Sequence, residues 1–383
     1  MKRVCLAFCA LLPALLLLTA CAAGNGAQTP TPPAAGTPAE TPAEPTGTAP
    51  ATPAPAPAPP ALEQTSFKLG HLNSTAHLLG FVAAEEGYFA EEGLDAELLL
   101  FASAGEMVAG LESGNLDAAF IGSVPTITFQ SQDHPVSVFG GAMTNGHGYV
   151  IKSEFTEGLS DWDITILKGR NVATVKNSVQ ELELYMLLDQ AGLDRETDLN
   201  VVVFDSQKDA FNALAGAEID AASVYSPYAS IAKNQGYEVV YYCNEEPLFE
   251  NQPCCRQVAL TQALADKPNT YTAFERALIK AYKFSQEDRE KTIQDVKKYI
   301  DIELDALEYE IYGGHSLSHP DPDKAATAAL QRKVVDFGYT TNYDIETRYN
   351  TEIYAGALNS LLAENPDDTL YRDLLAHFEA NDV

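Results

Sequence analysis

The chain has 383 residues, of which 46% are hydrophobic and 20% are charged, and its 54 acidic and 24 basic residues give a formal net charge of −30 at pH 7. This charge argues against nucleic acid as a partner, because such binding depends largely on Lys and Arg side chains that neutralise phosphates. A chain of this length usually folds into more than one compact unit.

The first twenty residues have the pattern of a secretory signal peptide. Lys2 and Arg3 precede a short apolar run, Val4–Leu18, and small residues follow before Cys21, as is typical of secretion signals. The ending Leu18-Thr-Ala-Cys21 resembles the lipobox of bacterial lipoproteins, which implies that Cys21 becomes the acylated first residue of the mature chain. An ordinary signal peptide with a coincidental cysteine is the alternative. After residue 20, no apolar run approaches the roughly 18–20 residues that span a bilayer.

Residues 21–62 change abruptly to Pro, Ala, Thr and Gly, with the run Pro53-Ala-Pro-Ala-Pro-Ala-Pro-Pro60 near the end. This composition buries little apolar area, and its prolines favour an extended conformation. We therefore expect a semi-rigid tether between the lipid anchor and a folded part that begins near residue 63. The protein is predicted to be extracytoplasmic and anchored to the bacterial cell membrane through Cys21.

From residue 63 on, short β-rich runs alternate with patterns of helical spacing. Strands are predicted at Ser66–Leu72, Glu97–Phe101 and Ala118–Ile121, and helices at Thr75–Phe89 and Ala104–Glu112. Strands that alternate with helices indicate a parallel sheet of βαβ units, so the predicted fold class is α/β. Beyond residue 268 the pattern is mostly helical, with predicted helices at Thr270–Glu287, Asp288–Ile300, Asp323–Phe337 and Asp367–Glu379.

The folded part repeats itself with an offset of 103 residues. Leu98–Phe101 matches Val201–Phe204, Leu111–Ala119 matches Leu214–Ala222, and Ser123 falls on Ser226, all without a gap. Strands of different α/β proteins look alike, so chance matching of apolar runs is the alternative. The gap-free register over several elements predicts two similar α/β halves.

Four junctions between a strand and the following helix carry polar residues. They are Asn73-Ser-Thr75, Gly122-Ser-Val-Pro125, Asn177-Ser178 and Tyr225-Ser-Pro-Tyr228. In open α/β sheets, ligands bind beyond the carboxyl ends of the strands, where helix N-termini offer unpaired N–H donors and a partial positive charge. For each serine, simple N-capping of its helix is the alternative.

Several motifs resemble those of one protein family. The segments are Leu69-Gly-His-Leu72, Gly80–Leu94, Leu111–Asp117 with Gly122–Pro125, and Leu167–Val172. From about Phe67 to Ala265, the chain resembles the extracytoplasmic solute-binding lipoproteins of ABC transporters, of the nitrate/sulfonate/taurine and thiamine-pyrimidine type. The resemblance implies a two-lobed periplasmic-binding-protein fold (type II, Venus-flytrap) with two similar βα lobes and a C-terminal helical extension.

The resemblance also implies that the chain crosses between the lobes twice, near Tyr149–Ile151 and Gln257–Leu260. Lobe one then combines residues 63–148 and 257–383, and lobe two spans 149–256. The implied function is capture of a small polar or anionic solute (nitrate, a sulfonate such as taurine, or a pyrimidine) and its delivery to a membrane permease driven by a cytoplasmic ATPase. We expect a monomer with no cofactor and no bound metal, and the identity of the solute stays open.

The resemblance carries a set of ligand-binding candidates onto this sequence: Asn73, Ser74, Thr75, His77, Gly122, Ser123, Thr144, Asn145, His147, Asn177, Ser178, Tyr225, Tyr228 and Arg256. Tyr225 would stack on the ligand or cover it. Arg256 would pair with an anionic head group, and a solvated charge at the edge of the cleft is the alternative. The Cys254-Cys255 pair favours a neutral heterocycle, because a cysteine run also occurs in some thiamine-pyrimidine relatives; partly buried strand cysteines are the alternative.

The cysteines of the folded part leave their redox state open. Cys243, Cys254 and Cys255 remain after the signal peptide and Cys21 are set aside. In an oxidising compartment, one disulfide from Cys243 to either of the other two can form. The third thiol then has no assigned role.

Two other functions compete with solute binding. A metal-binding lipoprotein of zinc type is the first, since His315-x3-His319 and His71-x5-His77 offer imidazoles, the usual ligands of zinc. His315 and His319 lie in a loop-like setting without a nearby cysteine or clear carboxylate partner, and His71 and His77 fall on a strand and a helix, so they need not converge. A surface-anchored enzyme is less favoured, because the chain has no His-Glu-x-x-His, Gly-x-Ser-x-Gly or glycine-rich phosphate-binding motif.

Overall fold

A computed structural model describes residues 60–160, 163–216 and 218–383. The predicted signal peptide, Cys21 and the tether as far as residue 59 lie outside these residues. Within them, none of the helices combines the length and the apolar character that crossing a membrane requires.

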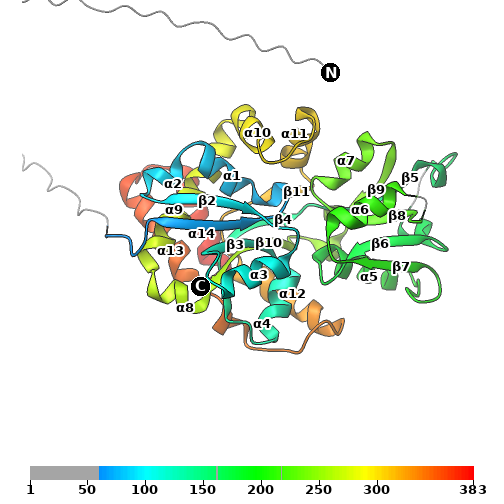
Figure 1. Ribbon diagram of the computed structural model, residues 1–383, viewed down its shortest axis with the longest axis horizontal. Coiled ribbons are helices and arrows are strands. Elements are labelled where there is room, and N and C mark those ends of the chain that lie inside the picture. Colours follow the sequence, from blue (N-terminus) through cyan, green and yellow to red (C-terminus); the bar gives the residue numbers. More distant parts are fainter. Residues whose placement is uncertain (1–59, 161–162, 217) are drawn as a thin grey trace, which may run out of the picture. The chain divides into compact units, whose positions relative to one another are not determined.

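The strands form two separate sheets. The first sheet runs in the order β2 (Asp95–Leu100), β1 (Ser66–His71), β3 (Ala118–Gly122), β10 (Pro253–Leu260), β4 (Val136–Asn145) and β11 (Ser316–Ser318). The second sheet runs in the order β7 (Asn200–Phe204), β6 (Asn171–Val175), β8 (Ala221–Tyr225), β5 (His147–Lys152) and β9 (Tyr237–Tyr242). Figure 1 shows the second sheet in green beside helices α5, α6 and α7. We call the part around the first sheet lobe one and the part around the second sheet lobe two.

The two sheets confirm the internal repeat. In each, the first three strands are parallel and the fourth is antiparallel to both of its neighbours. Strands β3 and β8 have bounds exactly one offset apart, and so do the helices α3 (Ala104–Glu112) and α6 (Gln207–Ala215). The predicted α/β architecture with two similar βα lobes is therefore present.

The antiparallel strand of each sheet is the one that links the lobes. The chain leaves the first sheet after Asn145, enters the second at His147, and returns at Pro253. These crossings lie two to four residues before the positions expected from the sequence. Strand β10 already belongs to the first sheet at Pro253, so residues 253–256 pair with lobe one. Two short connections of this kind are typical of a hinge between two bodies.

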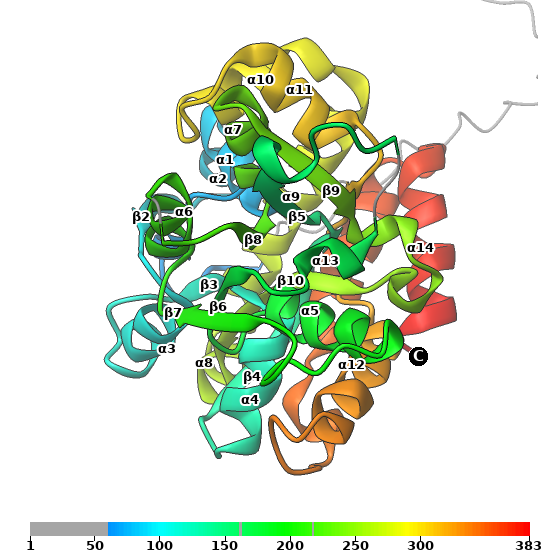
Figure 2. The same cartoon turned by 90° about the vertical axis from the view of Figure 1, so that its right-hand side faces the viewer.

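The helices cover the two sheets unequally. Lobe two carries α5 (Val179–Gln190), α6 and α7 (Tyr228–Asn234). Lobe one carries α1 (Leu78–Glu85), α2 (Tyr88–Glu91), α3, α4 (Ser123–Ser131), α8 (Thr261–Asp266), α9 (Pro268–Glu287), α10 (Arg289–Lys297), α11 (Leu304–Tyr312), α12 (Lys324–Asp336), α13 (Thr351–Glu364) and α14 (Thr369–Asn381). Helices α13 and α14 pack against each other, and Figure 2 shows α14 in red and α12 in orange. The C-terminal helical extension is therefore part of lobe one.

One predicted helix needs correction, and two helices were not predicted. The helix expected over residues 75–89 is divided into a 3-10 turn at Thr75–His77 and the helices α1 and α2, because Gly87 has a left-handed backbone with φ of 79°. The sequence patterns did not single out α11 and α13, whereas α9, α10, α12 and α14 lie where helices were predicted.

Aromatic packing fixes the long helix α9 on the first sheet. Phe274 of α9 stacks on Phe67 of β1 with a centroid distance of 4.6 Å, and Tyr271 meets the same ring edge-on at 5.6 Å. All three side chains are fully buried, and burial of each such ring contributes about 2 kcal/mol or more. This core holds β1 and β3 in place, and their carboxyl ends reach the candidate site.

Candidate functional site

A cavity of about 360 Å³ lies between the two lobes, beyond the carboxyl ends of the parallel strands. Residues from both lobes line it: Leu72, Ser74, His77, Ala102, Ser103, Ala104, Gly105, Gly122, Pro125, Thr128, Phe129, Gln132, Cys254 and Cys255 from lobe one, and His147, Val175, Lys176, Asn177, Ser178, Val179, Gln180, Asp205, Ser206, Gln207 and Tyr225 from lobe two. We call this cavity the cleft. Its position is the one where open α/β sheets bind ligands.

The junction between β6 and α5 is built as a capping box. The Ser178 hydroxyl accepts a hydrogen bond from the Glu181 backbone N–H at 3.1 Å, and the Glu181 carboxylate accepts one from the Asn177 N–H at 2.7 Å. Asn177 has φ of 53°, a left-handed conformation that asparagine tolerates better than most residues. The Ser178 hydroxyl also donates to the Val175 carbonyl at 2.6 Å. It is therefore committed to its own helix, as the capping alternative proposed.

The first junction joins the two lobes directly. The Ser74 hydroxyl caps the turn Thr75–His77 by accepting from the Ala76 N–H at 3.2 Å, and it donates to the Ser226 carbonyl of lobe two at 2.9 Å. The Thr75 hydroxyl forms a second hydrogen bond, with the Ser226 hydroxyl. One edge of the cleft is thus closed by direct contact between the first junction of lobe one and the Tyr225–Tyr228 junction of lobe two.

A third pair of junctions lines the cleft and was not among the sequence candidates. Ser103 caps α3 by accepting from the Glu106 N–H at 3.3 Å, and Ser206 caps α6 by accepting from the Asp209 N–H at 3.1 Å. Ser103 and Ser206 are one repeat offset apart, so the offset of 103 was the signal that could have found them. The N-termini of α3 and α6 therefore add N–H donors and partial positive charge from both lobes.

His77 presents a hydrogen-bond donor to the cleft. Its Nδ1 accepts a hydrogen bond from the Leu72 N–H at 3.0 Å, so the proton of the neutral ring sits on Nε2. The ring is fully buried and stacks on Phe120 at 5.0 Å. Among the described residues, Nε2 has no hydrogen-bond partner, and an unpaired buried N–H is costly unless a ligand or water accepts from it.

A buried charge pair lies beneath the cleft where the chain crosses between the lobes. His147 contacts the Glu183 carboxylate at 3.1 Å through Nδ1 and Cys254 Sγ at 3.2 Å through Nε2. Burial alone would lower the pKa of His147, but the Glu183 carboxylate outweighs burial and raises the pKa of His147 above its ordinary value. Gln252 donates to the same carboxylate at 2.7 Å. The pair is therefore held by contacts between separate segments of the chain.

Two consecutive cysteines face the cleft because β10 is irregular there. Successive side chains of a regular strand point to opposite faces, but the register of β10 against β4 shifts on both sides of Cys255. Both thiols consequently line the cleft, with their sulfur atoms 3.3 Å apart. The hydrogen bond from Cys254, together with the neighbouring His77 ring, lowers the pKa of the Cys255 thiol well below its ordinary value despite burial.

The cysteines form no disulfide in the described part of the chain. Cys243, Cys254 and Cys255 are all buried free thiols. Cys243 Sγ lies 3.9 Å from His147 Nδ1, beneath the cleft. The disulfide that the sequence left open from Cys243 is therefore absent here.

The structure brings half of the predicted binding residues to the cleft: Ser74, His77, Gly122, His147, Asn177, Ser178 and Tyr225. The predicted candidates that do not line it but lie in or next to the same junctions are Asn73, Thr75, Ser123 and Tyr228. The Ser123 hydroxyl is buried, with no partner among the described residues. Tyr228 packs edge-on against Tyr225 at 5.4 Å, so it supports the cleft wall from within lobe two.

Thr144, Asn145 and Arg256 lie away from the cleft. Thr144 and Arg256 line a different cavity, and Asn145 pairs with strand β11. Arg256 is 2% exposed; its Nε donates to the Pro322 carbonyl at 2.8 Å and its Nη1 to the Cys255 carbonyl at 2.9 Å. Once the irregularity has turned both thiols toward the cleft, Arg256 points the other way. It is therefore not placed to pair with an anion in the cleft.

The cleft has few ionisable side chains of fixed charge. Besides the two histidines, the two cysteines and Tyr225, they are Lys176 and Asp205, one of each sign. Burial raises the pKa of Tyr225 well above its ordinary value, so its hydroxyl stays protonated and can donate a hydrogen bond. The cleft therefore offers mainly uncharged donors.

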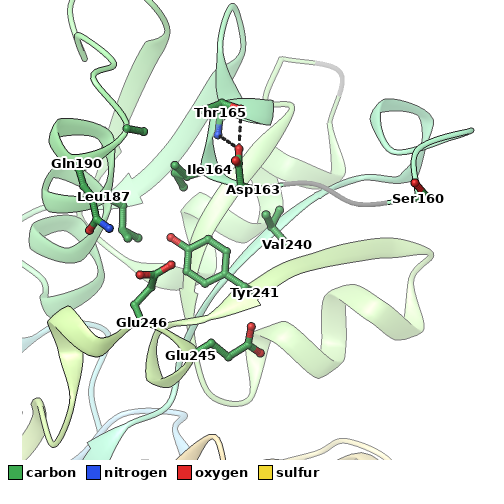
Figure 3. Close-up of a pocket in the computed structure, with 11 residues that line it drawn as sticks. Ser160, Asp163, Ile164, Thr165, Leu187, Gln190, Val240, Tyr241, Glu245 and Glu246 are labelled. Carbon is green, nitrogen blue, oxygen red and sulfur yellow. Dashed lines mark hydrogen bonds between the residues drawn. The ribbon is translucent and has the colours of Figure 1, made fainter.

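A second depression, of about 660 Å³, belongs to lobe two alone (Figure 3). Leu187 of α5 and Tyr241 of β9 form its apolar part, and Glu245 and Glu246 bring two carboxylates to its edge. The Asp163 carboxylate accepts a hydrogen bond from the Thr165 N–H at 2.9 Å. Because a single lobe forms it, this depression could not respond to movement of the lobes.

The histidine pairs considered for metal binding do not come together. His71 Nδ1 donates to the Leu72 carbonyl at 3.0 Å, whereas His77 faces the cleft. His315 pairs with Glu310 at 3.1 Å, and His319 lines a separate cavity. Neither predicted pair forms a shared site within the residues described.

Comparisons with known proteins agree on the fold. The model of the NMT1-like family matches residues 60–301. The protein named "Putative binding protein YtlA" from Bacillus subtilis is 25% identical over 250 residues, which cover 63% of this chain and 73% of that protein. The periplasmic nitrate-binding protein NrtA from Synechocystis superposes with a TM-score of 0.68 at 17% identity, covering 79% of this chain and 90% of that one. The aliphatic sulphonate binding protein SsuA from Escherichia coli gives a TM-score of 0.62 at 21% identity, with 75% and 92% covered. The fold is thus that of periplasmic binding proteins.

Proposed function

The chain belongs to the NMT1-like family, and from this premise we propose that it is the solute-binding component of an ABC importer. In this role it captures a small polar solute between its lobes and delivers it to a membrane permease. The observation that carries the proposal is the cleft of about 360 Å³, which both lobes line and which sits beyond the carboxyl ends of both sets of parallel strands. A solute held there contacts both bodies at once, so binding favours the closed arrangement.

The donors of the cleft support a solute rich in acceptor atoms. The N-termini of α3, α5 and α6 point N–H groups and partial positive charge at the cleft, and His77 adds an N–H that has no partner among the described residues. Carbonyl, sulfonyl and nitrate oxygens all accept such bonds. With Arg256 turned away, an anion would rely on these dipoles and on Lys176, which Asp205 partly offsets.

The envelope location completes the proposal. The signal peptide pattern, the lipobox-like Leu18-Thr-Ala-Cys21 and the proline-rich tether favour a lipoprotein held on the outer face of the cell membrane. In that position the folded part would reach solute outside the membrane and stay close to the permease. Acylation of Cys21 can be tested by mass spectrometry of the mature N-terminus, where an unmodified cysteine would contradict it.

A thermal-shift screen of the purified full-length chain tests the binding function. The panel contains nitrate, taurine and other alkanesulfonates, pyrimidines and amino acids. We expect one chemical class to raise the melting temperature by mass action, by several degrees at a concentration of about 100 Kd, with one molecule bound per chain by calorimetry. Melting temperatures that stay constant over the whole panel would contradict the proposal.

The same screen separates the competing functions. A bound solute that is recovered unchanged supports a binding protein, whereas its conversion to product would indicate an enzyme. A response to sulfonates and nitrate that disappears with Lys176→Ala would indicate an anion. A response to pyrimidines that survives Lys176→Ala would indicate a neutral heterocycle bound through the helix N-termini and His77.

A further inference from the structure

A separate cavity of about 370 Å³ lies against lobe one, apart from the cleft, and residues 250–252 of the crossing segment form one side of it. Helix α12, helix α14 and the segment 317–323 contribute to its walls, and none of its lining residues also lines the cleft. Three of these residues are His319, Asp321 and His377. They come from two parts of the chain that are more than 50 residues apart, so the fold alone brings them together.

The three side chains are arranged as ligands of one ion would be. One possible ligand atom from each lies within 4.8 Å of the other two. The two imidazole centroids are 4.7 Å apart, and His377 Nε2 is 3.7 Å from Asp321 Oδ1. The separation of 3.7 Å between His377 Nε2 and Asp321 Oδ1 is too long for a direct hydrogen bond, but it fits two ligand atoms of one metal ion with bonds of about 2 Å each.

Asp321 is a buried carboxylate short of partners. Its side chain is fully buried, and Oδ2 has no hydrogen-bond partner among the described residues. Asp382 Oδ2 is unpartnered in the same way, while Asp382 Oδ1 accepts from the Lys324 N–H at 2.9 Å. A buried carboxylate oxygen without a donor or cation is unfavourable.

The neighbouring guanidinium of Arg256 does not pair with the Asp321 carboxylate. Arg256 directs Nε to the Pro322 carbonyl, and its Nη2 lies 3.9 Å from Asp323, not from Asp321. Asp321 therefore has no Arg or Lys partner among the described residues, and its Oδ2 faces a second acid, Asp382.

We propose that His319, Asp321 and His377 form a binding site for a divalent transition-metal ion of the zinc type. Two imidazoles and one carboxylate are a donor set that zinc prefers, and the cavity leaves room for a water or another ligand to complete the coordination. The ion would tie the segment before α12 to α14, and so fix the C-terminal helices on the first sheet. None of these three residues lines the cleft.

A second cluster provides an internal comparison. His147, Glu183 and Cys243 also place their ligand atoms within 4.8 Å of one another. However, both ring nitrogens of His147 already have partners, Glu183 and Cys254. A metal there would have to displace the charge pair beneath the cleft, so we assign no ion to that cluster.

Zinc titration of the full-length chain, without an affinity tag, tests the site. We expect one zinc ion per chain by calorimetry and elemental analysis, and an affinity at least tenfold weaker in His377→Gln and in His319→Gln. His377 is 41% exposed, so its replacement should leave the fold intact, which far-ultraviolet circular dichroism would verify. His134→Gln, at a histidine paired with Glu112 on the surface, is the matched control and should bind zinc as the wild type does.

Two outcomes would overturn the proposal. Absence of stoichiometric zinc uptake would mean that Asp321 and Asp382 only share a proton. Uptake that persists in both His319→Gln and His377→Gln but is lost in His147→Gln would place the ion at the other cluster. X-ray absorption of the zinc-loaded chain gives an independent readout, since the proposed site predicts nitrogen and oxygen neighbours and no sulfur.

Discussion

The rim and the floor of the cleft are built on different principles. The rim consists of the helix N-termini at Ser103 and Ser206, where each hydroxyl caps its own helix. The floor consists of His147, Glu183 and Cys254, which contact one another across the two lobes and the crossing strands. The rim hydroxyls thus find their hydrogen-bond partners within one helix turn. The floor side chains find theirs on residues up to 107 positions away in the sequence.

This difference teaches how the fold separates stability from recognition. A change at the rim should alter the surface offered to a solute and cost little in folding free energy. A change at the floor removes a partner from a buried charge and should cost much more, because the remaining charge stays buried.

Removal of the floor carboxylate should be the most destabilising change. Glu183→Ala leaves His147 and Gln252 without their shared acceptor, and we expect the free energy of unfolding to fall by about 3–5 kcal/mol. Urea denaturation measures it. Glu157→Ala, at an exposed position, is the control and should stay within about 0.5 kcal/mol of the wild type. Equal effects of the two substitutions would contradict the interpretation of Glu183 as part of a buried charge pair.

Filling the rim should abolish solute binding without loss of stability. Gly105 lines the cleft in the first turn of α3, and a Cβ there would meet its nearest atoms only at 3.9 Å. Gly105→Trp therefore fits the helix while its ring occupies the solute space, and we expect at least a tenfold loss of affinity by calorimetry, or about 1.4 kcal/mol. Gly356→Trp, in α13 with no atom within 4 Å, is the matched control. Unchanged affinity in Gly105→Trp would move the solute site elsewhere.

The two rim caps should contribute equally, as their repeat relationship implies. Ser103→Ala and Ser206→Ala each remove one acceptor from a helix N-terminus, and each should lower the free energy of unfolding by about 1 kcal/mol. Ser206→Gly should cost only a few tenths of a kcal/mol, because glycine is also tolerated at this position. A loss above about 3 kcal/mol in either alanine variant would show that the hydroxyl has partners beyond its own helix.

The floor should also give a weak dependence of stability on pH. The pKa of His147 in the folded chain is raised above the ordinary value of 6.5. The contribution of the pair is therefore complete below pH 6.5 and is lost as the pH rises through the raised pKa. Between pH 6.5 and 9, the free energy of unfolding should fall more steeply in the wild type than in His147→Gln. Parallel pH profiles of the two proteins would contradict the charged pair.

The sequence located the strand-to-helix junctions beside the cleft, but it singled out neither rim serine, and of the floor residues it named His147 as a binding candidate without its contacts. The offset of 103 residues, visible in the apolar runs, predicted that β3 corresponds to β8 and α3 to α6. Short-range patterns located Ser74 and Ser178 at their junctions. The same offset applied to Ser103 would have identified Ser206 as well. These features are local, so patterns of a few residues determine them.

The floor could not be predicted because it depends on tertiary contacts. An irregularity in the pairing of β10 with β4 turns the side chain of Arg256 away from the cleft. No residue type in the sequence indicates this irregularity. The contact of His147 with Glu183 and Cys254 joins three segments, and the meeting of His319 with His377 depends on how α14 packs. Composition and periodicity carry no information on such contacts.

Hydrogen exchange with and without the solute found by the screen tests the central claim most directly. If the solute is held between the lobes, backbone amides at the N-termini of α3 in lobe one and of α5 and α6 in lobe two should all become protected together, in the same concentration range. Protection confined to one lobe, or found only in the depression formed by lobe two, would contradict the account.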